Sequence, residues 1–305
     1  MMISGEISVR ASVSVIVPSF NCARFLGEAI ESIIAQTVPV SQIIIVDDGS
    51  TDDTEQVVSR FIDPRIEYIK QKNAGVSAAR NTGLDAARGE LVTFLDADDR
   101  WRPTFVERMA GLLTADPSAV CAFANFLRFD HETGRRMMGQ FQYYPELRNM
   151  PNRIPENKAF DTLVSCGEFP AYTTVMMFRR ALIASLRFNT SLKLCEDAHF
   201  CLQAFMRGAV IFTDEILADV RRHDGNASHD VGEMVLAKLK ALRALDQYVT
   251  GKHVAAYHDR LVKAQVDAAI HRIRSGWRHY RECLSIPGSR RRKLKGLVRM
   301  ALSAF

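Results

Sequence analysis

The fold is decided by the stretch Leu91-Val92-Thr93-Phe94-Leu95-Asp96-Ala97-Asp98-Asp99, in which an apolar run leads directly into an acidic cluster. Two similar runs lie upstream, Val13–Val17 and Ile43–Val46, and the second also ends in carboxylates, in Asp47-Asp48-Gly49-Ser50. Between them, Cys22–Gln36 carries apolar residues at the spacing of one helix face. Short apolar runs of this kind are typical of strands buried on both faces of a parallel sheet. The sequence therefore predicts an α/β fold with a mainly parallel central sheet flanked by helices.

The alternation of helix and strand patterns continues to about residue 220. We expect a helix from Thr51 or Asp52 to about Phe61, a strand at Arg65–Lys70, a helix at Ala74–Ala87, strands at Ala119–Phe129 and Thr173–Phe178, a helix at Glu196–Arg207 and a short strand at Ala209–Phe212. Phe141–Pro155 contains three prolines and predicts a loop over the functional edge of the sheet. From Val231 to Arg281 the pattern is helical. The expected division is a tail at 1–10, an α/β domain at 11–220, a helical C-terminal extension at 221–286 and a basic tail at 287–305.

The composition is that of a globular protein. The chain has 305 residues, of which 47% are hydrophobic, which is enough for a full core. Its six cysteines are scattered and form no C-x-x-C pair, which favours reduced thiols in a cytosolic protein. The start carries no signal-peptide pattern, and the apolar runs are far shorter than the ~20 residues of a membrane-spanning helix.

The positive charge is concentrated at one end of the chain. The net charge is +5, but residues 287–305 hold six basic residues and no acidic one, which leaves 34 basic and 35 acidic residues elsewhere. A nucleic-acid partner is therefore not expected. Leu294, Leu297, Val298, Ala301, Leu302 and Phe305 fall on one helical stripe. Such a helix either lies on an anionic membrane surface or packs on its own protein. We expect a cytoplasmic protein, with peripheral contact at the inner membrane face in the first case.

The acidic cluster suits a divalent cation. Asp96 and Asp98 lie one residue apart at a strand end, where ligands bind in parallel sheets. Carboxylate oxygens are preferred by Mg²⁺ and Mn²⁺. One alternative is an acidic turn in which Asp99 caps a helix starting near Pro103. Another is a phosphatase of the haloacid-dehalogenase type with Asp96 as nucleophile, although that motif normally opens the fold and continues with Thr or Val.

Two further groups of polar residues lie where the sheet pattern places ligands. Asp47 and Asp48 could accept hydrogen bonds from a base or ribose, or simply form a turn that caps a helix. Gly75 follows Lys72-Asn73-Ala74 and starts a helix that carries Arg80, an arrangement that favours phosphate. The alternative for this second group is a surface helix with ordinary solvated charges.

Taken together, these segments resemble family 2 glycosyltransferases. The resemblance rests on four stretches in the family's order and spacing: Val13–Asn21, Ile45–Asp52, Asn73–Gly75 with Ala79–Gly83, and Phe94–Asp99. It is dense over about residues 13–100 and returns at 171–228. It implies the GT-A fold, a Rossmann-like nucleotide-binding half merged with an acceptor half, and it implies inversion at the anomeric carbon.

The resemblance also implies roles for individual residues. The nucleotide-contacting positions it implies are Pro18, Asp47, Asp48, Lys72, Arg80 and Asp96. Asp98 falls at the metal-binding position, and Asp197 of the pair Glu196-Asp197 falls at the general base. Arg221–Ser228, with His223, is similar to a later Arg-x-His…Ser stretch near the diphosphate. Without the resemblance, Glu196-Asp197 would be only an acidic pair suited to a helix start.

Departures from the family pattern refine the expectation. Processive members carry Gln-x-x-Arg-Trp, whereas here Gln203 is followed by Arg207-Gly208, so we expect a non-processive enzyme. Ser185-Leu186-Arg187-Phe188 stands where Gly-Gly-Phe is common. We expect metal-dependent, inverting transfer from a nucleotide sugar, first of all a UDP-sugar, to a hydroxyl of a glycan or lipid-linked acceptor in polysaccharide biosynthesis. The alternatives are the phosphatase and a catalytically dead sugar-nucleotide-binding module.

Overall fold

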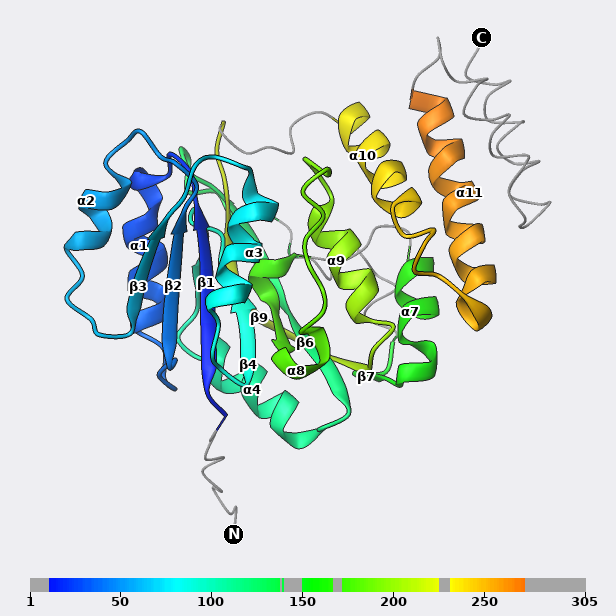
Figure 1. Cartoon of the computed structure of the whole chain (residues 1–305), viewed down its shortest axis with the longest axis horizontal. Coiled ribbons are helices and arrows are strands. Elements are labelled where there is room, and N and C mark those ends of the chain that lie inside the picture. The colour runs from blue at the N-terminus through cyan, green and yellow to red at the C-terminus, as the bar shows by residue number, and fades with distance from the viewer. Residues whose placement is uncertain (1–10, 138, 140–149, 167–171, 225–230, 272–305) are drawn as a thin grey trace.

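The computed structural model describes residues 11–137, 139, 150–166, 172–224 and 231–271. Within these residues, nine strands form one sheet between layers of helices (Figure 1). The strand order is β3-β2-β1-β4-β8-β6-β9-β5, and β7 pairs with β9 away from this path. The edge strand β5 (Arg100–Trp101) pairs antiparallel with β9. The predicted tails at 1–10 and 287–305 lie outside the described residues.

The first half of the sheet is parallel, as predicted. Its strands are β1 (Val13–Ser19), β2 (Gln42–Asp47), β3 (Ile66–Lys70) and β4 (Leu91–Phe94). β1 lies between β2 and β4 and pairs with both in parallel, and β2 pairs in parallel with β3. The connecting helices are α1 (Ala23–Ile34), α2 (Thr54–Ser59) and α3 (Val76–Ala86). The carboxyl ends of these strands therefore meet at one edge.

The second half is mixed. β8 (Met176–Arg179) runs antiparallel to β4 and to β6 (Ala119–Asp130), and β6 runs parallel to β9 (Ala209–Arg222). The predicted short strand at Ala209–Phe212 is therefore ten residues too short. The predicted loop at Phe141–Pro155 lies largely outside the described residues, but Arg153–Ile154 forms strand β7 against β9. The first part of the predicted strand Thr173–Phe178 is a 3₁₀ turn, η1 (Thr173–Val175).

The sheet is buried on both faces, because adjacent side chains of its strands enter two different hydrophobic clusters. Ile16 of β1 lies in a cluster with Ala79 of α3 and Phe200 of α9 (Glu196–Ala204). Its neighbours Val15 and Val17 lie in the other cluster, with residues of α1 and of α4 (Phe105–Ala115). This alternation is what a continuous apolar strand requires.

The C-terminal helices pack on the first of these clusters. They are α10 (Val231–Arg243), the 3₁₀ turn η2 (Gly251–His253) and α11 (Val254–His271). α11 adjoins α7 (Glu156–Ser165), and α10 adjoins α9, as Figure 1 shows. Leu239, Leu245 and Leu261 share a core with the sheet. The domain division predicted at residue 220 falls within β9, two residues before its end.

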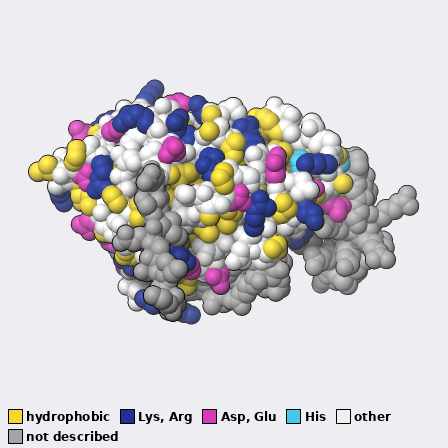
Figure 2. All heavy atoms as spheres, turned by 90° about the horizontal axis from the view of Figure 1, so that it is seen from below, with side chains coloured by type: hydrophobic (Ala, Val, Ile, Leu, Met, Phe, Trp, Pro, Cys, Tyr) yellow, Lys and Arg dark blue, Asp and Glu magenta, His cyan; other side chains and the backbone are white. Residues whose placement is uncertain are grey.

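The described surface shows no separation of charge on the face in Figure 2, where basic and acidic side chains are interspersed. The five cysteines within the described residues are free, and Cys283 lies outside them. No helix in the described part of the chain is long and apolar enough to cross a membrane.

Candidate active site

Asp47 and Asp48 lie at the carboxyl end of β2 and bind the loops around them. Asp47 is fully buried and accepts a hydrogen bond from the Ser50 amide at 2.7 Å and another from the Tyr68 hydroxyl of β3. Burial acts to raise the pKa of Asp47, but the hydrogen bonds from Ser50 and Tyr68 hold that pKa below its usual value. Asp47 therefore stays ionised and fixes the turn that follows β2.

Asp48 fixes the second loop at this edge. Its two carboxylate oxygens accept hydrogen bonds from the Ala74 amide at 3.0 Å and the Gly75 amide at 2.7 Å, and Gln71 donates a third. Gly49 has a φ of +80°, and a Cβ there would lie 2.9 Å from the Asn73 amide nitrogen. Only glycine lets the two loops approach this closely. Asp48 thus places the loop between β3 and α3 at the end of β2.

Arg80 connects two carboxylates that are far apart in the sequence. It projects from α3, and its Nη2 donates to Asp96 Oδ1 at 2.8 Å, just beyond β4. Its Nη1 donates to Glu196 Oε1 at 2.8 Å, at the start of α9. Burial acts to lower the pKa of Arg80, whereas Asp96 and Glu196 raise it, so the guanidinium is charged at all working pH values. The alternative, a surface helix with ordinary solvated charges, is therefore wrong for Arg80, which forms a buried bridge.

Asp98 faces a histidine from the end of β9. His223 Nε2 lies 3.1 Å from Asp98 Oδ2, and the ring of His223 also packs against Phe25 at 4.8 Å between centroids. Burial, followed by the charge of Asp96, raises the pKa of Asp98. The histidine predicted from the Arg-x-His stretch is therefore brought to the predicted metal-binding carboxylate.

Asp99 is not a helix cap, and the turn alternative is wrong for this residue. The helix α4 begins at Phe105, whereas buried Asp99 accepts hydrogen bonds from the Arg221 amide at 2.8 Å and the Thr174 hydroxyl at 3.1 Å. Burial, together with Asp98 and Asp96, raises the pKa of Asp99 well above its ordinary value. Asp99 joins the acidic loop to β9 in the interior.

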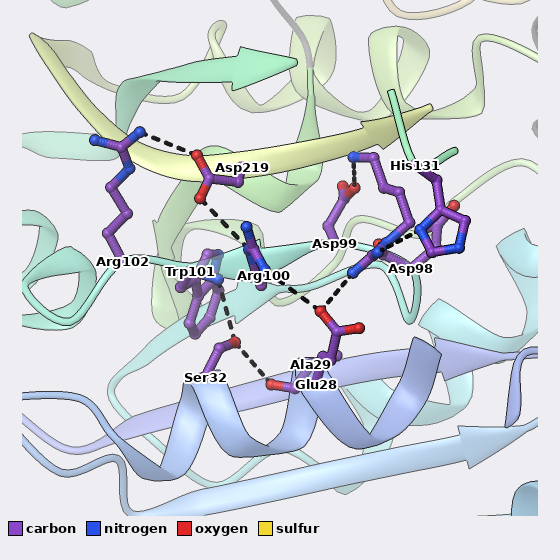
Figure 3. A network of polar contacts seen from close by, with 11 residues as sticks. Glu28, Ala29, Ser32, Asp98, Asp99, Arg100, Trp101, Arg102, His131 and Asp219 are labelled. Atoms are coloured by element: carbon purple, nitrogen blue, oxygen red, sulfur yellow. Dashed lines mark hydrogen bonds and ion pairs between the residues drawn. The ribbon is translucent and has the colours of Figure 1, made fainter. Parts of the chain in front are cut away.

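Arg221 of β9 connects this acidic loop to α1, and Figure 3 shows Glu28 of α1 close to Asp98 and Asp99. Its Nε donates to the Asp98 carbonyl at 2.8 Å and its Nη2 donates to Glu28 of α1 at 2.7 Å. The guanidinium lies 4.6 Å from the Phe25 ring centroid and 4.9 Å from that of Phe129. The motif Arg221–Ser228 contains Arg221, but the sequence predicts no role for it, because its contacts with Asp98 and Asp99 form only in the folded chain.

Asp197 lies in the first turn of α9, beside Glu196. Burial, followed by the Glu196 charge, raises the pKa of Asp197 to about 7, although Arg80 acts to lower it. The residue before this pair, Cys195, has a φ of +60°, so the chain turns sharply as it enters the helix. A carboxyl with a pKa near neutrality can exchange a proton at working pH.

The remaining predicted residues lie at the same edge. Pro18 is buried in β1 opposite Val46 of β2, and Lys72 is exposed in the loop between β3 and α3. Neither Phe188 nor Asn81 was expected from the sequence to have a role at the site. The Asn81 side chain donates to the Phe188 carbonyl at 2.9 Å and accepts from its amide at 2.8 Å. The motif Ala79–Gly83 contained Asn81, but no local pattern connects it to a residue so distant in the chain.

The donor atoms fit a cation that is held jointly by the protein and a phosphate ligand. Among the described residues, no three His, Cys, Asp or Glu side chains form a complete metal cluster. The pair Asp98 and His223 offers one carboxylate and one imidazole, with Asp96 close by. Mg²⁺ and Mn²⁺ sites of this type use one or two carboxylates and complete their coordination with substrate phosphates and water.

The comparison with known protein families identifies the chain. The family model described as Glycosyl transferase family 2 matches residues 14–186, more than half of the chain. The chain belongs to this family. The predicted enzyme class, a glycosyltransferase, is thereby confirmed, and a haloacid-dehalogenase phosphatase does not fit a chain of this family.

Relatives and solved structures extend this result. The chain is 29% identical to glycosyltransferase GlyA of Streptococcus pneumoniae serotype 4 over 271 residues, which are 83% of this chain and 38% of that protein. It thus spans well under two thirds of that relative. TarS 1-349 of S. aureus, in complex with UDP-GlcNAc, superposes with a TM-score of 0.62 at 19% identity, covering 85% of this chain and 81% of that one. Mannosyltransferase PcManGT of Pyrobaculum calidifontis, in complex with GDP-Man and Mn²⁺, gives 0.59 at 18% identity and covers 97% and 81%. These likenesses confirm the predicted GT-A fold.

Proposed function

We propose that the chain transfers a sugar from a nucleotide-sugar donor, first of all a UDP-sugar, to a hydroxyl of a glycan or lipid-linked acceptor, with inversion at the anomeric carbon. One observation carries the proposal: Arg80 joins Asp96, beyond β4, to Glu196, which adjoins Asp197. A donor-side carboxylate and a candidate base therefore lie on either side of one side chain. The UDP-GlcNAc bound by TarS and the GDP-Man bound by PcManGT support this class of donor.

The donor would be held at the carboxyl ends of the first strands. Asp98 and His223 would hold Mg²⁺ or Mn²⁺, which would neutralise the departing nucleoside diphosphate. Asp47, Asp48 and Asp96 would border the bound donor, and the first two order the turn after β2 and the loop that carries Lys72. Pro18 would contact the nucleotide from β1. The basic side chain of Lys72 would face phosphate from the exposed loop.

Asp197 would act as the general base. The acceptor hydroxyl must lose its proton as its oxygen attacks the anomeric carbon, opposite the departing diphosphate. The transition state resembles an oxocarbenium ion, and attack from the opposite side inverts the configuration. The pKa of Asp197, raised to about 7 by burial and by Glu196, suits proton transfer near neutral pH.

The test compares the wild type with Asp98→Ala, Asp197→Asn and the control Glu156→Gln, which removes an exposed carboxylate from the first turn of α7, beside the start of β9 and not at its end. Each is assayed for transfer or donor hydrolysis with a panel of UDP- and GDP-sugars at increasing Mn²⁺. Asp98→Ala should lose its dependence on Mn²⁺. Asp197→Asn should still bind donor but lose transfer by roughly 10²–10⁴-fold, the usual worth of a general base. Equal turnover in all four proteins would refute the mechanism, and donor binding without turnover by the wild type would favour a binding module.

A further inference from the structure

The guanidinium of Arg80 is enclosed by protein groups, and carboxylates of the protein occupy both of its terminal nitrogens. The side chain is only 5% exposed, and both terminal nitrogens are engaged by carboxylates at 2.8 Å. The remaining Nε is buried and has no hydrogen-bond partner. A cation that binds a donor phosphate would instead keep at least one nitrogen accessible.

An aromatic surface fixes the plane of this guanidinium. The Arg80 guanidinium carbon lies 5.3 Å from the centroid of the Phe188 ring. Phe188 in turn stacks on Phe200 of α9 at 4.1 Å with an interplanar angle of 3°. Asn81, the next residue on α3, holds the Phe188 backbone through two hydrogen bonds. A planar guanidinium can satisfy this stack and two carboxylates together, whereas a lysine ammonium cannot.

We propose that Arg80 is a positioning residue that does not touch the donor: it holds Asp96 and Glu196 in a fixed relation, so that Asp197 on α9 faces the donor anchored beyond β4. This inference rests on the proposed function. The role proposed for Arg80 differs from the role that the family resemblance implies, which is contact with the nucleotide. The proposed role also explains why Arg80 pairs with carboxylates from two segments that lie a hundred residues apart in the chain.

The ion pairs of Arg80 also affect the pKa of the proposed base, Asp197. The groups that act on Asp197 are Glu196 on its own helix, Arg80 on α3 and Asp96 beyond β4, while Tyr172 and the thiols of Cys195 and Cys201 lie within its field. Arg80 lowers the pKa of Asp197, and Glu196 raises it. Removing Arg80 should therefore move base activation to higher pH, and neutralising Glu196 should move it to lower pH.

The experiment uses the full chain with Arg80→Lys, Arg80→Gln, Glu196→Gln and the double variant Arg80→Gln/Glu196→Gln. The control is Arg88→Lys, because Arg88 is exposed, lies just beyond the same helix and pairs with Glu67. Folding is checked by circular dichroism. UDP affinity is measured by calorimetry at saturating Mn²⁺, and kcat and the pH profile of kcat/KM are measured with the best donor.

Both single Arg80 variants should keep UDP affinity within about threefold of the wild type, which is less than the loss of one charged hydrogen bond would cause. Their kcat should fall by about 100-fold, the effect expected when a reacting group is misplaced by about 1 Å. The midpoint of the pH profile should rise in Arg80→Gln and fall in Glu196→Gln. The losses in kcat should not multiply in the double variant, because the two side chains act as one unit.

A loss of UDP affinity of about tenfold or more with kcat preserved would overturn the inference, because it would show that Arg80 binds the donor. Unchanged pH midpoints, or multiplying losses in the double variant, would also overturn it. If Arg80→Gln does not fold, Arg80→Lys, which retains the charge, decides the split between affinity and kcat. Absence of turnover by the wild type would instead refute the proposed function, and this inference with it.

Discussion

Replacing Gly83 by alanine should destabilise the protein because α3 packs directly on the central strand β1. A Cβ at Gly83 would lie 2.3 Å from Ile16 Cγ2 and 3.0 Å from Ile16 Cγ1. Carbon atoms in contact prefer about 3.5–4.0 Å, so the helix or the strand would have to move by about 1 Å. Ile16 is fully buried, and its strand is held on both sides by β2 and β4. The strand therefore has little room to yield.

The magnitude follows from two opposing terms. Overpacking a filled core costs about 1–3 kcal/mol, and the 2.3 Å approach places this site at the upper end. Alanine recovers about 1 kcal/mol through its higher helix propensity. The expected net loss is about 2 kcal/mol, or a fall in Tm of about 3 °C for a chain of 305 residues. The matched control is Gly111→Ala on α4, where nothing lies within 4 Å of the added Cβ, and this change should stabilise by about 0.5–1 kcal/mol.

The assay is urea unfolding followed by circular dichroism, together with kcat for the best donor. Arg80 lies one turn before Gly83, so displacement of α3 should also lengthen its 2.8 Å contacts with Asp96 and Glu196 and lower kcat. Combining Gly83→Ala with Ile16→Ala should cost less stability than the sum of the two changes, because the contacted methyl group is gone. Equal stability of Gly83→Ala and Gly111→Ala, or additive losses with Ile16→Ala, would refute the packing argument.

Two further predictions concern the acidic loop and the basic tail. Arg221→Lys cannot reproduce both the Nε contact to the Asp98 carbonyl and the pairing with Glu28. The affinity for Mn²⁺, measured by electron paramagnetic resonance with UDP present, should therefore fall by about tenfold or more. An unaltered affinity would show that the acidic loop keeps its shape without Arg221. We also propose that residues 287–305, which lie outside the described part of the chain, contact anionic membrane surfaces. Deleting them should abolish sedimentation with phosphatidylserine vesicles and leave activity on a water-soluble acceptor unchanged, and persistent sedimentation would exclude the tail as the contact.

Strands β1, β2 and β4 could be predicted because each is a largely apolar, fully buried run. β9 could not be predicted over its full length, since Thr213-Asp214-Glu215 interrupts the apolar pattern after Phe212. The structure explains the interruption. The pairing with β6 shifts register between Phe123 and Phe126, opposite this polar segment, and Asn125 donates to the Asp214 carbonyl at 3.1 Å. A strand with a bulge in its pairing loses the periodicity by which sequence reasoning finds strands.

Some of the site residues could likewise be predicted from the sequence, and others could not. The rule that ligands bind beyond the carboxyl ends of parallel strands was sufficient to place Asp47, Asp48, Asp96 and Asp98 at one edge. Asp197 came only from the family resemblance, because nothing local distinguishes it from an acidic pair at a helix start. Its raised pKa depends on burial against residues that are distant in the sequence. A helix cap stayed open as an alternative for Asp99 because its partner, the Arg221 amide, lies on a strand that was predicted to end ten residues earlier.

The motif Ala79–Gly83 places a buried charge, that of Arg80, on a helix that packs closely on the sheet. An arginine on a helix normally extends its charge to water. Here Ala79 and Gly83 face β1, and such small side chains let the helix axis approach the sheet until no Cβ fits at Gly83. That approach brings Arg80 under the ends of β4 and α9, where only paired carboxylates make its burial tolerable. The glycine and the arginine therefore depend on one another: a larger residue at Gly83 would withdraw the guanidinium, and Asp96 and Glu196 would lose the charge that holds them together.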